Sequence, residues 1–168
     1  NIFHPLEPSA YTMGTIESFV ESTRRTRQSS ATRVILFSEC TADDELAQRT
    51  GFAPGTALFY IQRLHEIDGI VRILNHNYFR RDCLPGLTPQ LAEGSVYHYL
   101  EAELHVSIVT SKRTITVEKA TPLDRKWIDL GEYDCLAVVS NQTSNSDGVM
   151  FEYTQPRHHP AIFRFQDN

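Results

Sequence analysis

Cysteine is scarce in this sequence, and no cysteine motif is present. The 168 residues include only Cys40, Cys83 and Cys135. Their odd number and wide spacing fit neither a disulfide framework nor the Cys-x-x-Cys unit of a zinc site. This usage predicts a protein of the reducing cytoplasm.

Long apolar runs and an excess of positive charge are also missing. A membrane span needs roughly 18 to 20 apolar residues, and no run approaches that length. No signal peptide is visible. The composition, 40% hydrophobic and 22% charged, is typical of one soluble globular domain. With a formal net charge of −5, the chain lacks the positive field that nucleic-acid binding requires. We therefore expect no membrane partner, and no DNA contact through this chain itself.

The usual catalytic and cofactor motifs are not found. The sequence contains no Gly-x-Ser-x-Gly elbow of a serine hydrolase and no glycine-rich phosphate loop. Seven histidines are present, but none forms a His-x-x-x-His pair, and His158 and His159 as strand neighbours would point to opposite faces. We expect no metal, no cofactor and no enzymatic activity.

Helix-like and strand-like patterns occupy most of the chain. Strands are expected over residues 31–39, 57–67, 70–79, 106–121, 134–143, 149–157 and 161–165. Helices are expected over residues 14–28, within residues 40–52, from Ser95 and from Thr121. Thr41 is expected to cap the second helix and Gly51 to end it. Strands in hairpin-joined runs with helices between them predict an α+β domain on a largely antiparallel sheet.

The strand beginning at Ala57 carries two basic residues, Arg63 and His65, and Asp68-Gly69 marks a hairpin turn after it. A two-residue loop would pair Ile67 with Ile70 and place the basic residues on the face of Arg72, Leu74 and His76. A three-residue loop would pair Glu66 with Ile70 and place them with Val71, Ile73 and Asn75. The residues alone leave both alternatives open.

Several polar residues lie on elements that otherwise bury apolar faces, as expected of a ligand site. They are Arg63, His65, Ser95, Tyr97, Glu152, Arg157 and His158. Ser95 at a helix start could seat an anion together with Arg63, or it could be a plain N-cap. Arg63 could bind a ligand, or it could form an ion pair with Glu66 or Glu152.

In their order along the chain, these segments resemble the effector-binding (UTRA) domain of GntR-type transcription regulators of the HutC branch. The resemblance is carried by DDELAQRTGFAPGTALFYIQRLHEIDG, by LNHNYF and GSVYHYL, and by FEYTQPRHHPAIFRF, and it covers about 150 residues. It implies a chorismate-lyase-like fold, a mostly antiparallel sheet with flanking helices. It also implies that residues 1–12 are a linker from a missing N-terminal winged helix-turn-helix domain, and that residues 13–168 form the effector-binding domain of a homodimer.

The family's effector contacts, carried over by position, form a defined set. They fall on Arg63, His65, Asn75, Ser95, Tyr97, His105, Glu152 and His158. This set favours the three-residue loop, which brings Asn75 to the face of Arg63. The chain departs from the family at His65, which replaces a second arginine, and at Asn75, which replaces a glutamate. His159 and Ala161 replace a common Arg-x-Asp.

The expected function is ligand sensing without catalysis: a small anionic effector, such as a sugar phosphate, modulates DNA binding by the attached domain. Two alternatives belong to other classes. One is a chorismate-lyase-like enzyme, which would share the fold, and the other is a dimerisation module without ligand.

Overall fold

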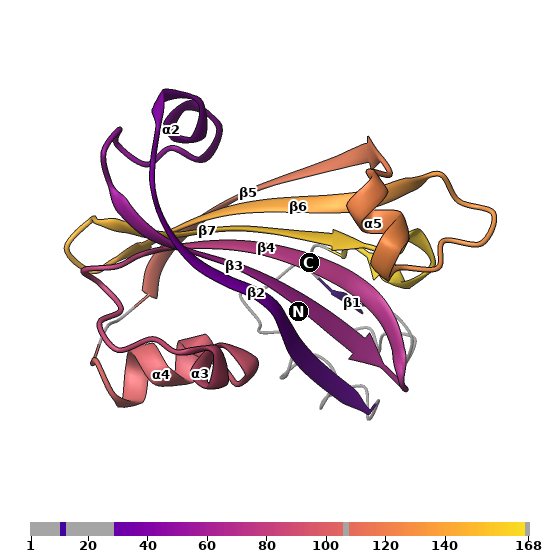
Figure 1. The fold of residues 1–168 in the computed structure, drawn as a ribbon, viewed down its shortest axis with the longest axis horizontal. Helices are drawn as coiled ribbons and strands as arrows, with labels where there is room; N and C mark the ends of the chain where they lie inside the picture. The colour runs from indigo at the N-terminus through magenta and orange to yellow at the C-terminus, as the bar shows by residue number, and fades with distance from the viewer. Residues whose placement is uncertain (1–10, 13–28, 106–107, 167–168) are drawn as a thin grey trace.

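The protein is built on a six-stranded antiparallel sheet in the order β2-β3-β4-β7-β6-β5 (Figure 1). The computed structural model describes residues 11–12, 29–105 and 108–166. The strands are β2 Ser30–Thr41, β3 Ala57–Ile67, β4 Ile70–Arg80, β5 Ile108–Lys119, β6 Cys135–Asn145 and β7 Met150–His158. Two further short strands, β1 Tyr11–Thr12 and β8 Phe163–Arg164, pair in parallel, so the last residues of the predicted linker contact the end of the domain. The α+β prediction is confirmed.

Short helices cover both faces of the sheet (Figure 1). The helices are α2 Asp44–Thr50, α3 Pro89–Glu93, α4 Val96–Ala102, α5 Pro122–Trp127 and the 3-10 helix η1 Pro160–Ile162. Helices α3 and α4 lie below the sheet in Figure 1, α2 lies above its left end, and α5 overlaps the strand ends at the right. The apolar clusters place α2 and α5 on the same side, where Leu58 and Leu64 of β3 point. We call these two sides the α3–α4 face and the α2–α5 face. No helix in the described part of the chain is long and apolar enough to span a bilayer.

Alternating strand residues supply a separate apolar core to each face. On the α3–α4 face, strand residues pack against α3, α4 and the loop before them. This cluster contains Phe59, Ile61, Phe79, Leu84, Leu87, Ala92, Val96, Leu100 and Phe151. On the α2–α5 face, Leu64, Leu74, Leu136 and Val138 pack with Ile128 and Leu130 beside α5. The sheet thus lies between two apolar layers, and polar side chains on either face are held among buried groups.

The β3–β4 hairpin contains both a tight turn and a bulge. Asp68 and Gly69 have φ angles of 52° and 78°, the left-handed pair that a two-residue type I′ turn requires. Ile67 pairs with Ile70 across this turn. The register then shifts by one residue at His65, which pairs with Ile73. The extra residue is Arg72, whose carbonyl oxygen accepts a hydrogen bond of 2.8 Å from the His159 amide.

This bulge resolves the two loop alternatives in an unexpected way. The loop has two residues, so the preference for three is wrong. Beyond the bulge, however, Arg63 pairs with Asn75, which is the shared face that the three-residue loop predicted. The inserted residue shifts the register of β4 by one position, and such a shift moves every later side chain of the strand to the other face.

Helix ends mostly follow their predicted signals. Gly51 ends α2 with a φ of 95°, and Thr121 caps α5 in a capping box with Asp124. The Thr41 cap was wrong: Thr41 is the last residue of β2, and Asp43 caps α2 by accepting a bond of 2.8 Å from the Leu46 amide. A carboxylate at this position meets the free amides and the positive end of the helix. Helix α3 was not predicted, and the expected helix over residues 14–28 lies outside the described residues.

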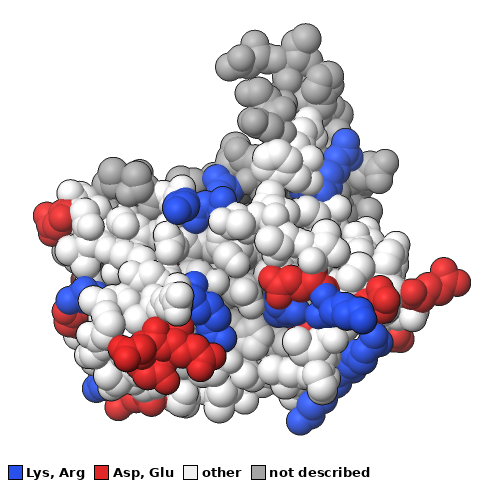
Figure 2. Space-filling model, turned by 90° about the horizontal axis from the view of Figure 1, so that it is seen from above, with Lys and Arg blue, Asp and Glu red and all other residues white. Residues whose placement is uncertain are grey.

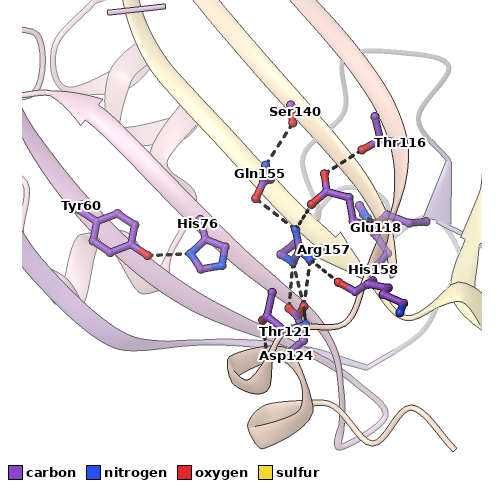
Figure 3. Close-up of polar contacts among 12 residues, drawn as sticks. Tyr60, His76, Thr116, Glu118, Thr121, Asp124, Ser140, Gln155, Arg157 and His158 are labelled. Atoms are coloured by element: carbon purple, nitrogen blue, oxygen red, sulfur yellow. Dashed lines mark hydrogen bonds and ion pairs between the residues drawn. The ribbon is translucent and has the colours of Figure 1, made fainter. Parts of the chain in front are cut away.

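A buried ion pair fixes α5 to the sheet (Figure 3). Arg157 on β7 donates from Nε to Asp124 Oδ1 at 3.0 Å and from Nη1 to Glu118 Oε1 at 2.8 Å. The side chains of Arg157 and Asp124 are 5% and 0% exposed. Burial lowers the pKa of Arg157, but hydrogen bonds to Asp124 and Glu118 raise it, so that it is higher than usual overall. Arg157 therefore has a structural role on the α2–α5 face.

Replacing Arg157 with Met should lower the free energy of unfolding by about 3 to 5 kcal/mol, because Asp124 would remain buried without a counter-charge. The double variant R157M/D124N should recover much of this loss. The asparagine side chain introduced at position 124 carries no charge, and its oxygen could still accept the hydrogen bond from the Thr121 backbone N–H. Arg80→Met, which breaks an exposed pair with Asp82, is the control and should cost less than about 1 kcal/mol. Urea unfolding checks the series, and equal losses for R157M and Arg80→Met would contradict it.

Candidate functional site

Polar side chains cross the α3–α4 face of the sheet in neighbouring positions. Residues paired across antiparallel strands share a face. The register therefore places one set of polar residues on the side of α3 and α4. The set comprises Arg63 and His65 on β3, Asn75 and Asn77 on β4, Glu152, Thr154 and His158 on β7, and Asn141 and Thr143 on β6. The predicted meeting of β3, β4 and β7 residues on one face is observed.

Two basic residues of β3 each contact one asparagine of β4. Arg63 Nε donates to Asn77 Oδ1 at 2.8 Å. His65 Nε2 lies 3.3 Å from Asn75 Nδ2, and its Nδ1 lies 3.0 Å from Thr32 Oγ1. Both contacts between β3 and β4 run diagonally, so Arg63, His65, Asn75 and Asn77 form one polar cluster, which we call the amide cluster.

Each asparagine of the amide cluster keeps one polar atom without a hydrogen-bond partner. Asn75 and Asn77 are 7% and 0% exposed. Among the described residues, Asn75 Oδ1 and Asn77 Nδ2 are buried atoms that no group bonds. For Asn77 the orientation is fixed, because the arginine that it faces can only donate, so its Nδ2 is an open donor. Turning the Asn75 amide over would exchange its atoms and still leave one of them open.

Buried unsatisfied polar atoms cost free energy, roughly 1 to 3 kcal/mol each. Native proteins hold few of them, and each needs an explanation. Two such atoms lie at adjacent same-face positions of β4 beside a guanidinium, so that one ligand bound there would supply both missing partners. The amide cluster thus offers hydrogen-bonding groups of the kind that bind a ligand.

The histidines of this face are neutral near pH 7. Burial lowers the pKa of His65 well below its usual value, and the charges of Arg63 and His158 lower it further. Burial also lowers the pKa of His158 to about 4, against an opposing hydrogen bond with the Ala137 carbonyl. Arg63 is therefore the positive charge of the amide cluster.

Arg63 also connects the sheet to the helices that cover it. Its Nη1 donates to the carbonyl oxygen of Ala92 in α3 at 3.2 Å. Ser95 follows three residues later as the N-cap of α4, where its Oγ accepts from the His98 amide at 3.1 Å. The N-cap prediction for Ser95 is confirmed, and Arg63 reaches toward the junction of α3 and α4.

The other predicted site residues lie as follows. Glu152 and His158 are 2% and 0% exposed and lie on the α3–α4 face. Tyr97 lies in α4, and its side chain is outside the described part. His105 is exposed after α4, with a φ of 54°. The sequence analysis also grouped Arg157 with these polar residues, and this was wrong. Arg157 is the neighbour of His158 along β7, so its side chain points to the opposite face.

Four residues of this face were not among the predicted contacts: Asn77, Asn141, Thr143 and Thr154. Asn77 is two positions after Asn75, so strand alternation alone would have placed them together. Thr143 lies on β6 opposite Glu152, and only the sheet order brings it here.

On the α2–α5 face, by contrast, acidic and basic side chains are interspersed over the surface (Figure 2).

The comparisons with known proteins identify the domain type to which this sheet and its covering helices belong. The UTRA domain family matches residues 25–164. The chain therefore belongs to the UTRA domain family. Its predicted assignment as a domain of this GntR-regulator type is confirmed, and the HutC branch stays a prediction.

Named relatives are transcription regulators of Bacillus subtilis. The chain is 39% identical over 110 residues to the HTH-type transcriptional regulator TreR, covering 66% of this chain and 46% of TreR. It is 24% identical over 126 residues to the HTH-type transcriptional regulator GmuR, covering 75% of this chain and 53% of GmuR. The chain thus spans about half the length of each regulator.

Solved structures show the same fold. The effector-binding domain of the B. subtilis trehalose repressor TreR superposes with a TM-score of 0.74 at 33% identity, over 82% of this chain and 96% of that one. PhnF from Mycobacterium smegmatis superposes with a TM-score of 0.80 at 16% identity, over 94% of this chain and 69% of that one, which supports the fold alone.

The buried histidines predict an acid-sensitive fold. The unfolded chain binds a proton at each histidine near pH 6.5, whereas folded His158 does so only near pH 4. The unfolded state therefore holds more protons in this window, and the stability present above pH 6.5 is lost as the pH falls toward 4. His158 alone should contribute about 3 kcal/mol of this loss.

Urea unfolding across that pH range tests the prediction with two variants. His158→Asn keeps a donor for the Ala137 carbonyl and removes the titration, so its stability should depend less on pH. His98→Asn, at an exposed position, should leave the pH dependence unchanged. Parallel curves for wild type and H158N would show the account of His158 to be incorrect.

Proposed function

We propose that this chain is the ligand-sensing part of a longer GntR-type transcription regulator. Its effector is a small hydroxylated anion of the sugar phosphate class, bound on the α3–α4 face. The observation that carries the proposal is the amide cluster, where Arg63 and two open amide atoms share one buried surface. The domain senses its ligand and does not transform it.

Charge supports an anionic effector. Arg63 keeps its charge at any physiological pH. Its neighbour His65 stays neutral because burial and Arg63 itself lower the histidine's pKa. A phosphate placed beside Arg63 would gain a charge-assisted hydrogen bond, which is stronger than a neutral one. The Ser95 hydroxyl and the junction of α3 and α4 are proposed to contact the same anion.

Hydrogen-bonding capacity supports hydroxyl groups on the rest of the effector. The cluster offers one open donor, Asn77 Nδ2, and one open atom of the Asn75 amide. A hydroxyl group both donates and accepts, so neighbouring hydroxyls of a sugar can satisfy both atoms. A purely apolar or lipid-like ligand would leave both atoms unsatisfied.

The relatives support the assignment to a regulator. The similar B. subtilis proteins carry the name HTH-type transcriptional regulator, and one solved relative is described as a trehalose repressor. In the full protein, we propose, an attached DNA-binding domain contacts DNA and two copies associate as a homodimer. The effector shifts the equilibrium between two arrangements only by its difference in affinity for them, typically 1 to 3 kcal/mol.

Isothermal titration calorimetry with glucose 6-phosphate and trehalose 6-phosphate tests the proposal, with a long-chain fatty acid as the comparison. At least one sugar phosphate should bind. Arg63→Gln should then weaken binding by roughly 10- to 100-fold, the value of a charge-assisted hydrogen bond. Arg33→Gln removes the same charge from an exposed position on β2 and should leave the affinity unchanged.

Binding of the fatty acid in place of both sugar phosphates would overturn the anionic effector. An equal effect of R63Q and Arg33→Gln would show that only the overall charge matters. Thermal melting of both variants without ligand checks that the domain remains folded.

A further inference from the structure

We infer that Thr143 is an effector-binding residue that forms a hydrogen bond with a hydroxyl group of the effector, at the end of the site away from Arg63. This assignment rests on the proposed function above. Its Oγ1 is a buried atom that no group bonds in the described structure, although the residue is only 1% exposed. Thr143 lies on β6, outside the hairpin that supplies the amide cluster, and its role would extend the site over four strands.

The sheet register places Thr143 on the face of the amide cluster. Thr143 pairs with Glu152 on β7, and Glu152 pairs with Phe79 on β4, two residues from Asn77. Asn77 itself pairs with Thr154, which pairs with Asn141 on β6. A continuous row of amide, hydroxyl and carboxylate groups therefore connects Asn77 with Thr143 on this face.

Burial alone does not explain the open hydroxyl of Thr143. Thr50 in α2 is 0% exposed, and its Oγ1 donates to the Leu46 carbonyl at 2.7 Å. A threonine in this fold can thus be buried and bonded at once. Valine has the same shape without the hydroxyl, so a threonine that only fills space loses stability to an uncompensated polar atom. A ligand that bonds the hydroxyl removes this disadvantage.

The position of Thr143 sets the size and chemistry of the effector. Two strand spacings and one step of two residues separate Asn77 from Thr143, or roughly 12 Å between their Cα atoms. Inorganic phosphate beside Arg63 cannot reach across this distance. The effector must be elongated, with its anionic group near Arg63 and a neutral hydroxylated end near Thr143.

Two matched substitutions test this assignment. Thr143→Val should leave the melting temperature of the free domain equal or higher, because it removes an unsatisfied polar atom. It should also weaken the tighter-binding sugar phosphate by roughly 3- to 10-fold, the contribution of one neutral hydrogen bond. Thr50→Val should lower the melting temperature and leave the affinity unchanged, since its hydroxyl is already bonded within the protein.

Inorganic phosphate is the third probe, and it separates the two ends of the site. Thr143→Val should not change its affinity, whereas Arg63→Gln should reduce it. If the wild type binds a sugar phosphate and T143V binds it equally well, the assignment of Thr143 fails and the proposed function stands. If the wild type binds neither sugar phosphate, the proposed function and the assignment fall together.

Discussion

A single inserted residue, Arg72, determines which side chains of the β3–β4 hairpin share a face. The two-residue turn at Asp68 and Gly69 would otherwise align Arg63 with the opposite side of β4. The bulge shifts the register by one residue, and Arg63 pairs with Asn75 as a result. The amide cluster, its open atoms and the proposed contact with an anion all require this register. The bulge is itself held by the bond from the His159 amide to the Arg72 carbonyl.

The two faces of the sheet use polar residues in different ways. On the α2–α5 face, Arg157 is bonded by Asp124 and Glu118, and the pair holds a helix in place. On the α3–α4 face, Asn75, Asn77 and Thr143 are buried without full satisfaction. A satisfied buried network makes a face rigid, whereas unpaired buried polar atoms cost free energy. This contrast separates the structural polar groups from those proposed to meet the effector.

The sequence contains most of the local information about this fold, and the missing part is long-range. Alternation located the strands, and Gly51, Ser95 and Thr121 marked helix ends correctly. The bulge at Arg72 could not be found, because both registers give acceptable alternation along β4. Arg157 was grouped with His158 although neighbours in a strand face opposite ways, so the pattern held a signal that was missed. The position of Thr143 beside the other polar residues could not be predicted without the strand order β4-β7-β6. Buried atoms that lack a hydrogen-bond partner can be identified only once the neighbouring groups have been placed.

The central claim is that the effector binds on the face of Asn75 and Asn77 and not on the face of Gln62 and Gln155. Side-chain amide resonances of these four residues, followed by NMR during titration with glucose 6-phosphate and then trehalose 6-phosphate, report on both faces in one sample. The account predicts large shifts for Asn75 and Asn77 with little change at Gln62 and Gln155. Saturable shifts at Gln62 and Gln155, with the two asparagine amides unmoved, would contradict it.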